Sequence, residues 1–180
     1  MKIDVIKTGY LEENCYVLSI DNNCLVIDPG DDFLKIKNKI GDKKVLKVLI
    51  THYHFDHVGA LNDVRKYYNA DVIDYMSDKN QKVGPFTFEI IDTKGHKEDS
   101  VTYYFKNEKL MFVGDFIFKG TIGRCDLKGG NYKEMLKSIN MIKKYDKDIT
   151  IYPGHGNSTT LKEEINNNPY LKGDVLWIKE

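Results

Sequence analysis

Short apolar runs separated by turn residues dominate the first third of the chain. Val, Ile and Leu crowd three of these runs, at residues 3–7, 15–20 and 24–28. Such runs are typical of β-strands, and the short polar turn Asp-Asn-Asn between the second and the third indicates a hairpin. The next run, residues 45–51, is almost continuously apolar, which is typical of a strand buried on both faces. The pattern therefore predicts an antiparallel beginning followed by a buried strand.

Helical periodicity takes over between and after these strands. Residues 33–40 alternate apolar side chains with lysines and end before Gly41, and residues 57–68 have apolar positions close to helical spacing. The same criteria predict strands at residues 71–75, 86–91, 101–105, 109–113 and 149–152, and helices at 131–144 and 158–167. Strands with interspersed helices and no repeat or linker predict sheets covered by helices in one domain spanning residues 1–180.

Composition narrows the possible partners. The 27 basic and 27 acidic residues give a formal net charge of zero, which disfavours nucleic acid or an anionic membrane surface as a partner. Because the sequence has neither a signal-like N-terminal block nor an apolar stretch long enough to span a bilayer, we expect a cytoplasmic protein. Three cysteines without a CxxC pair favour reduced thiols over a disulfide framework.

The sequence THYHFDH, residues 51–57, holds three of the five histidines of the chain. It lies between the buried strand 45–51 and the helix predicted from residue 57, so it forms a strand-to-helix loop. Three more polar residues also follow predicted strands: His96, Asp115 and His155. Because active groups in layered α/β proteins collect in the loops beyond strand ends, we expect these four loops to meet at one place.

The donor set predicts metal binding. Its five imidazoles and two carboxylates are His52, His54, Asp56, His57, His96, Asp115 and His155. Such donors suit zinc first, with iron or manganese as alternatives, and seven of them exceed the four that one tetrahedral ion uses. Two ions about 3.5–4 Å apart activate water for hydrolysis. The competing interpretations are a metal-binding module without catalysis and, for His96 or His155 alone, a hydrogen-bonded core histidine.

These residues resemble a known family. Thr51–Gly59 matches the signature THxHxDHxG of the metallo-β-lactamase-fold hydrolases, and GH at 95–96, GD at 114–115 and PGHG at 153–156 extend the likeness over most of the chain. Residues 116–131 and 153–171 are similar to segments of the small glyoxalase II-like branch. The resemblance implies a four-layer αββα sandwich of two mixed β-sheets. It also implies one metal on His52, His54 and His96, a second on Asp56, His57 and His155, and Asp115 as the bridge.

The implied activity is hydrolysis of a small-molecule thioester of the hydroxyacylglutathione type by a metal-bridging hydroxide, with Asp56 helping to orient that hydroxide. A related class with a similar signature uses a single iron to oxidise persulfides, so a persulfide dioxygenase is the alternative enzyme. Larger glyoxalase II enzymes grip glutathione with a C-terminal helical domain that this sequence does not contain, which leaves the thiol half of the substrate open. The oligomeric state also stays open.

Two positions near the motifs have competing interpretations. Arg124 is predicted to contact a substrate carboxylate, with a structural ion pair to Asp126 as the alternative. Cys125 is predicted to be an inert or oxidisable thiol, because no histidine is left to activate it if all five bind metal. Around His96, residues 93–100 read TKGHKEDS where the family usually has TPGHTxGS, so charged residues replace part of the loop.

Overall fold

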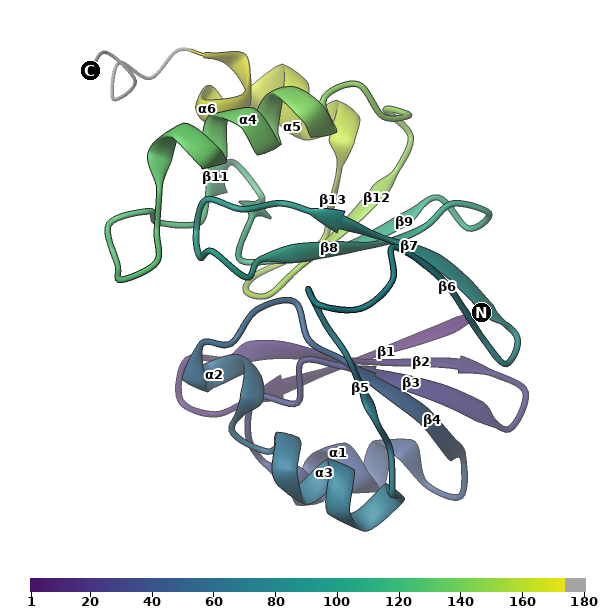
Figure 1. The fold of residues 1–180 in the computed structure, drawn as a ribbon. Helices are drawn as coiled ribbons and strands as arrows, with labels where there is room; N and C mark the ends of the chain where they lie inside the picture. The colour runs from purple at the N-terminus through teal and green to yellow at the C-terminus, as the bar shows by residue number, and fades with distance from the viewer. Residues whose placement is uncertain (174–180) are drawn as a thin grey trace.

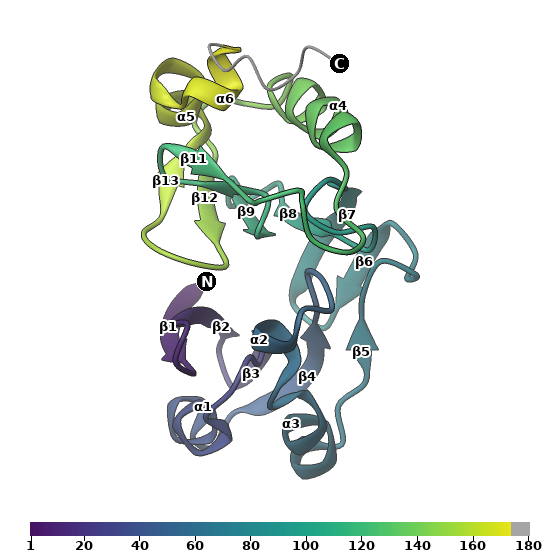
Figure 2. The same cartoon turned by 90° about the vertical axis from the view of Figure 1, so that its left-hand side faces the viewer.

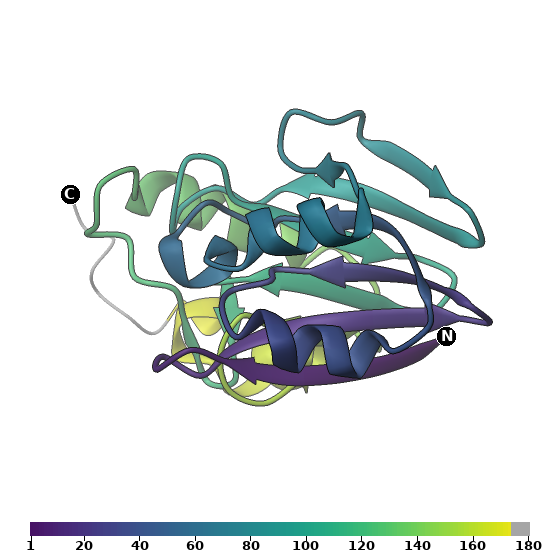
Figure 3. The same cartoon turned by 90° about the horizontal axis from the view of Figure 1, so that it is seen from below.

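Two β-sheets pack face to face and helices cover the outer face of each, as Figures 1 and 2 show. The computed structural model describes residues 1–173. The first sheet, in the order β1-β2-β3-β4-β5, contains β1 (Lys2–Thr8), β2 (Glu13–Ile20), β3 (Asn23–Ile27), β4 (Lys44–Leu49) and β5 (Val72–Ile73). Helices α1 (Phe33–Ile40) and α3 (Leu61–Tyr68) cross its outer face, which Figure 3 shows from below. Helix α2 (Phe55–Val58) lies at one end of this sheet.

The second sheet, in the order β13-β12-β9-β8-β7-β6, is built from strands between residues 80 and 160. Its strands are β6 (Asn80–Val83), β7 (Phe86–Asp92), β8 (Val101–Phe105), β9 (Leu110–Gly114), β12 (Thr150–Pro153) and β13 (Thr159–Thr160). The outer helices are α4 (Tyr132–Ile142), α5 (Leu161–Asn167) and α6 (Pro169–Lys172), and β10 (Ile117–Phe118) forms a separate hairpin with β11 (Thr121–Ile122). The predicted αββα sandwich is confirmed.

Side-chain alternation explains why the inner strands are apolar throughout. In β2, Cys15 and Val17 pack toward α1 and α3, whereas Tyr16 and Leu18 point between the two sheets. Successive side chains of a strand face opposite sides, so a strand that is covered on both faces needs an apolar residue at every position. A third core lies between the second sheet and α4–α6. The four layers therefore enclose three cores.

Some predicted elements differ from the structure. The prediction of one helix over residues 57–68 is wrong, because the N–H of Ala60 donates to the carbonyl of Pro29, 3.0 Å away, and the helical segment divides into α2 and α3. The predicted helix over 158–167 begins only at Leu161, since residues 159–160 pair with β12. Strand β6, the β10–β11 hairpin and α6 were not predicted. Within residues 1–173, every helix is too short or too polar to cross a membrane.

Candidate metal centre

The site lies where the two sheets meet at one end. β3 runs parallel to β4, and β9 runs parallel to β12, so the segments that follow each pair leave from the same edge of their sheet. Cross-sheet bonds fix these loops: the Thr51 carbonyl accepts from the N–H of Val101 at 2.9 Å, and the N–H of Asn14 donates to the Gly154 carbonyl at 2.7 Å. The predicted convergence of the four loops is therefore what the structure shows.

Glycine at position 154 lets the chain pass close to the centre. A Cβ added there would come within 2.4 Å of Asp115 Oδ1 and 2.6 Å of His57 Cε1. Gly114 has φ 53° and packs against Thr51, so a side chain at that position would meet Thr51 Oγ1 at 2.3 Å. Any larger residue at either position would displace atoms of the site.

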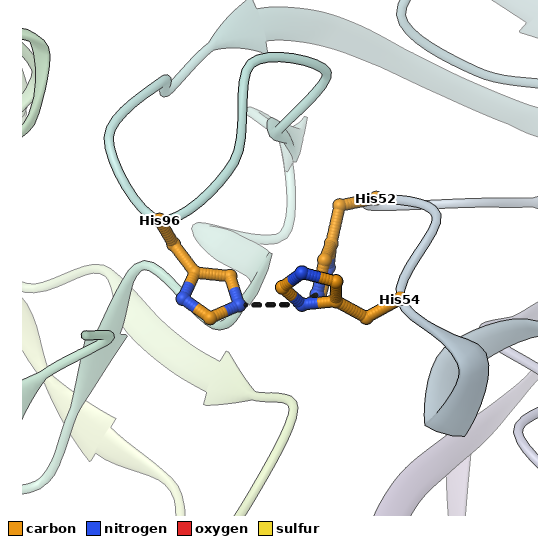
Figure 4. A group of neighbouring side chains, drawn as sticks. All are labelled: His52, His54 and His96. Atoms are coloured by element: carbon orange, nitrogen blue, oxygen red, sulfur yellow. Dashed lines mark hydrogen bonds between the residues drawn. The ribbon is translucent and has the colours of Figure 1, made fainter. Parts of the chain in front are cut away.

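His52, His54 and His96 form the first cluster, called here the three-histidine group (Figure 4). His52 Nε2 lies 3.1 Å from His54 Nδ1, and His96 Nε2 lies 2.8 Å from the same atom. His52 and His54 come from the loop after β4, whereas His96 comes from the loop between β7 and β8. One ring nitrogen of each residue thus points to a common position, as ligands of one ion would.

Asp56, His57 and His155 form the second cluster, called here the carboxylate group. His155 Nε2 lies 3.2 Å from Asp56 Oδ2, and His57 Nε2 lies 3.9 Å from the same oxygen. Asp115 stands between the two groups: its Oδ1 is 3.3 Å from His57 Nε2, and its Oδ2 is 3.6 Å from His96 Nε2. A single carboxylate therefore reaches donors of both groups.

The outer nitrogens of the rings fit a metal centre. Four of the five histidines direct Nε2 inward and place Nδ1 against a polar atom of the protein. The partners of Nδ1 are Thr51 Oγ1 for His52, Asp28 for His57, the Arg124 carbonyl for His96 and the Leu11 carbonyl for His155. Such partners fix the orientation of a metal-bound imidazole. His57 Nε2 and Asp115 Oδ1 are buried without a hydrogen-bond partner among the described residues. Because buried polar atoms are normally paired, these two fit metal ligands.

Asp28 supports the centre, a role that the sequence reasoning missed. Its Oδ2 is 2.9 Å from His57 Nδ1 and accepts from Thr51 Oγ1 at 2.5 Å, while its Oδ1 accepts from the Thr51 N–H at 2.7 Å. Glu13 lies behind the same ring, with Oε1 3.8 Å from His57 Nδ1, and burial raises its pKa well above the usual range. Asp28 follows a strand, as the predicted ligands do, and that signal was available in the sequence.

Two imidazoles of the three-histidine group, those of His52 and His54, favour the neutral form. Burial lowers the pKa of His52 well below its usual range, and the neighbouring His57 ring adds to that effect. Burial also lowers the pKa of His54, helped by His96. Neutral imidazole is the form that binds a metal ion. The lowered pKa of these two residues therefore favours metal binding.

The carboxylate group holds charge of both signs. Burial opposes protonation of His57, but the carboxylates of Asp115 and Asp28 outweigh it and raise its pKa well above the usual range. The hydrogen bond to Asp56 raises the pKa of His155 in the same direction. Burial works against ionisation of Asp56, yet its bond to His155 keeps the pKa of this carboxyl low. The raised pKa of both imidazoles thus favours positive charge on them beside the negatively charged carboxylates.

A cavity of about 520 Å³ opens onto both groups. Its apolar walls are Leu11, Phe55, Phe118 and Leu127. None of the charged residues at 97–99 lines it. Lys97 instead forms an ion pair with Asp99 beside the loop of His96.

Arg124 also lines this cavity, but its guanidinium is engaged. Nε and Nη2 donate to the two carboxylate oxygens of Asp126, each at 2.7 Å. The same hydrogen bonds lower the pKa of Asp126 to about 2. Burial raises the pKa of the adjacent Cys125 to about 11, so that its thiol is protonated at neutral pH. The structure shows the ion pair that was the alternative for Arg124, and substrate contact stays a prediction.

Comparison with known proteins identifies the family. Residues 8–79 and 77–155 match the sequence profile of the Metallo-beta-lactamase superfamily. The chain belongs to the metallo-β-lactamase superfamily. Its relatives include the probable metallo-hydrolase YqgX of Bacillus subtilis, 33% identical over 98% of this chain and 100% of that protein. The hydroxyacylglutathione hydrolase GloC of Haemophilus influenzae is 30% identical over 95% of this chain and 98% of that protein.

The solved structures agree with the superfamily assignment. The crystal structure of the B3 metallo-beta-lactamase BLEG-1 superimposes with a TM-score of 0.92 at 30% identity and covers 96% of this chain and 100% of that one. With the clustered His and Asp donors, these likenesses support a metal-dependent hydrolase of the metallo-β-lactamase fold.

Proposed function

We propose that this superfamily member is a dinuclear hydrolase of small-molecule thioesters. The observation that carries the proposal is the position of Asp115, whose two carboxylate oxygens face ring nitrogens of both groups. His52, His54 and His96 would hold one divalent ion and Asp56, His57 and His155 the other, with Asp115 as the shared ligand. Zinc suits this set of imidazole and carboxylate donors first, and iron or manganese second.

Two bound ions would supply Lewis-acid activation of water and of the substrate carbonyl. Within the chain, Asp56 is the residue proposed to touch the reacting water. Its pKa is low, so Oδ2 stays ionised and can accept a hydrogen bond that orients the water toward the carbonyl. His155, 3.2 Å away, fixes that oxygen.

The walls of the cavity support thioester chemistry. Leu11, Phe55, Phe118 and Leu127 surround the site with apolar surface, which limits access of bulk water and strengthens electrostatic interactions inside. When the histidines that line the cavity hold metal, its described lining offers no acid to protonate a leaving group, because Asp56 stays ionised and Arg124 is paired. A thiolate leaves without such help, whereas an alkoxide or amine needs a proton. The relative GloC is named a hydroxyacylglutathione hydrolase, and hydroxyacylglutathione is a thioester, which adds support for a thioester substrate.

The test combines metal analysis with a substrate panel. Purified protein is assayed for bound metals and then, with and without chelator, against thioesters, simple esters and a β-lactam. Two ions per chain and chelator-sensitive thiol release support the proposal. Hydrolysis of the β-lactam alone would show that the substrate is a β-lactam and not a thioester. Bound metal without turnover of any compound would show that the protein is a metal-binding module without catalysis. Asp71→Asn, at an exposed surface aspartate, is the matched control for Asp→Asn variants in the site.

The charge difference between the two groups favours one second candidate. Burial and neighbouring rings lower the pKa of His52 and His54, whereas carboxylates raise the pKa of His57 and His155, so a first ion would meet less competition from protons in the three-histidine group. One iron held by two of these histidines and the Asp115 carboxylate would suit a persulfide dioxygenase. One iron per chain and oxygen consumption with a persulfide, without thioester hydrolysis, would establish this alternative.

A further inference from the structure

A second cavity adjoins the one over the metal centre. It measures about 260 Å³ and is formed by the β1–β2 turn, the loop after β3 and the start of α2. Leu11, Phe55 and Asp56 line both cavities. Asp56, the residue proposed to orient the water, therefore lies on the boundary between them. A substrate whose carbonyl sits beside Asp56 can extend one arm into this second cavity.

Large apolar side chains at this boundary are exposed. Tyr10 is 81% exposed and Phe55 63% exposed, and their rings stack with centroids 6.4 Å apart. Leu11 follows Tyr10 at the turn and is also exposed. Contiguous exposed apolar surface at a cavity typically marks a binding site. The continuity of this surface with the reaction cavity identifies the substrate as the occupant.

The charges around the second cavity exclude an anionic occupant. Asp31 and Asp56 are its charged lining residues, and both are acidic. Arg124 is the only Lys or Arg that lines either cavity in the described part of the chain, and Asp126 holds its guanidinium bidentately. Carboxylate recognition normally depends on such a free guanidinium or ammonium group. No lysine or arginine among the described residues that line the two cavities is therefore free to bind the carboxylates of a peptide-like thiol.

We propose that the second cavity, walled by Tyr10, Leu11 and Phe55, binds an uncharged apolar arm, alkyl or aryl, of the thioester substrate. This inference rests on the proposed function for the identity of the reacting bond. Either the acyl group or the thiol could supply the arm, since both extend from the carbonyl carbon. The preferred substrate class is thus a neutral thioester with one apolar arm, in place of a glutathione conjugate.

Binding is tested without turnover. The zinc-loaded, ¹⁵N-labelled protein is titrated with an amide analogue of S-hexanoyl-N-acetylcysteamine, in which NH replaces the sulfur, and separately with the corresponding amide analogue of S-lactoylglutathione. We expect saturable shifts of the amide signals of Gly9, Leu11 and Gly30 with the first compound and much weaker ones with the second. Equal or stronger shifts with the glutathione conjugate would overturn the inference.

Kinetics identify which arm enters. The kcat/KM of S-hexanoyl-N-acetylcysteamine is compared with that of the S-acetyl compound for the acyl arm, and the kcat/KM of S-acetyl hexanethiol with that of S-acetyl ethanethiol for the thiol arm. The favoured arm should gain about threefold per methylene group until the cavity is filled, as expected for burial of apolar surface. An absence of chain-length preference in both series would contradict the proposal.

Variants tie the preference to the wall. Tyr10→Ser should lower the long-to-short kcat/KM ratio about fivefold, and Phe55→Ser should do the same, because each removes an apolar face from the arm. Tyr10→Phe should keep the ratio, since the ring and not the hydroxyl makes the wall. Leu34→Ser, at a 69% exposed leucine on α1, is the control and should leave the ratio unchanged. An unchanged ratio in both Tyr10→Ser and Phe55→Ser sinks the inference.

The two levels of proposal fail separately. Saturable binding of the amide analogue without hydrolysis of any thioester would refute the thioesterase assignment and keep the apolar cavity as a binding site. Thioester hydrolysis with neither NMR shifts nor chain-length preference would refute the inference and keep the thioesterase assignment.

Discussion

The two halves of the metal centre are built from similar residues but differ in charge. In the three-histidine group, burial and neighbouring rings hold His52 and His54 neutral. In the carboxylate group, His57 and His155 bind protons more tightly than free imidazole does, because Asp28, Asp56 and Asp115 surround them. An ion that binds His52 and His54 therefore meets less competition from protons than an ion that binds His57 and His155. The centre is therefore expected to fill in order, the three-histidine group first.

Removing the carboxylate that faces both halves should have the largest effect. Asp115→Asn takes away the negative charge that the two ions would share, so we expect kcat/KM to fall about 100-fold or more. Metal content should fall below two ions per chain, with the carboxylate group losing its ion first. Steady-state kinetics and elemental analysis measure both quantities against Asp71→Asn. Two retained ions with full activity would show that Asp115 is not a ligand.

Loss of the supporting carboxylate should weaken one half selectively. Asp28→Asn removes the charge behind His57 Nδ1, and partners of this kind typically contribute about 10–100-fold to metal affinity. The second ion should therefore dissociate at lower chelator concentration, while the first changes less. Chelator competition followed by metal analysis resolves the two steps. An equal weakening of both ions would mean that the halves are not independent.

Acidification should empty the two halves at different pH values. The raised pKa of His57 and His155 means that protons compete there already above pH 6.5, and each displaced proton weakens binding up to about tenfold per pH unit. The lowered pKa of His52 and His54 delays the same competition to more acidic solution. Dialysis between about pH 8 and about pH 6, followed by metal analysis, should remove one ion before the other. Simultaneous loss would contradict the charge difference.

A substitution outside both halves should change stability with little effect on metal. Buried Glu164 accepts from the Gly120 N–H at 2.8 Å, from Thr159 Oγ1 at 2.6 Å and from Asn168 Nδ2 at 2.8 Å. Glu164→Gln turns an acceptor into a donor facing these groups and should cost about 1–3 kcal/mol in the free energy of unfolding. Urea unfolding measures the loss, and metal content should stay at the wild-type value. A loss of one ion would instead connect Glu164 to the centre.

The seven proposed ligands are easier to find in the sequence than the residues that support them. All seven proposed ligands follow strand ends and therefore share one visible signal, which the fold brings to one place. Asp28 has the same signal but precedes Pro29-Gly30, and it was interpreted only as the end of a strand. Glu13 lies within β2, and neither periodicity nor spacing distinguishes a polar residue that supports a site from any other.

The elements that sequence reasoning missed have little local signal. β10, β11 and β13 contain two residues each, too few for any periodicity. β10 and β11 pair with each other in a short hairpin, and β13 pairs with β12. The helix predicted over residues 57–68 is divided by a hydrogen bond to the distant Pro29 carbonyl. Local patterns therefore located the long elements, whereas these two-residue strands are too short to carry a pattern.

The turn between β1 and β2 performs two tasks within a few residues. The Leu11 carbonyl lies 3.2 Å from His155 Nδ1, and the side chains of Tyr10 and Leu11 wall the apolar cavity. Insertions in this turn would displace the carbonyl that holds His155, a proposed metal ligand, and would also reshape the cavity. We therefore expect related sequences to differ in the side chains of this turn and not in its length. The Gly84-Pro85 hairpin between β6 and β7 lines neither cavity and should tolerate added residues.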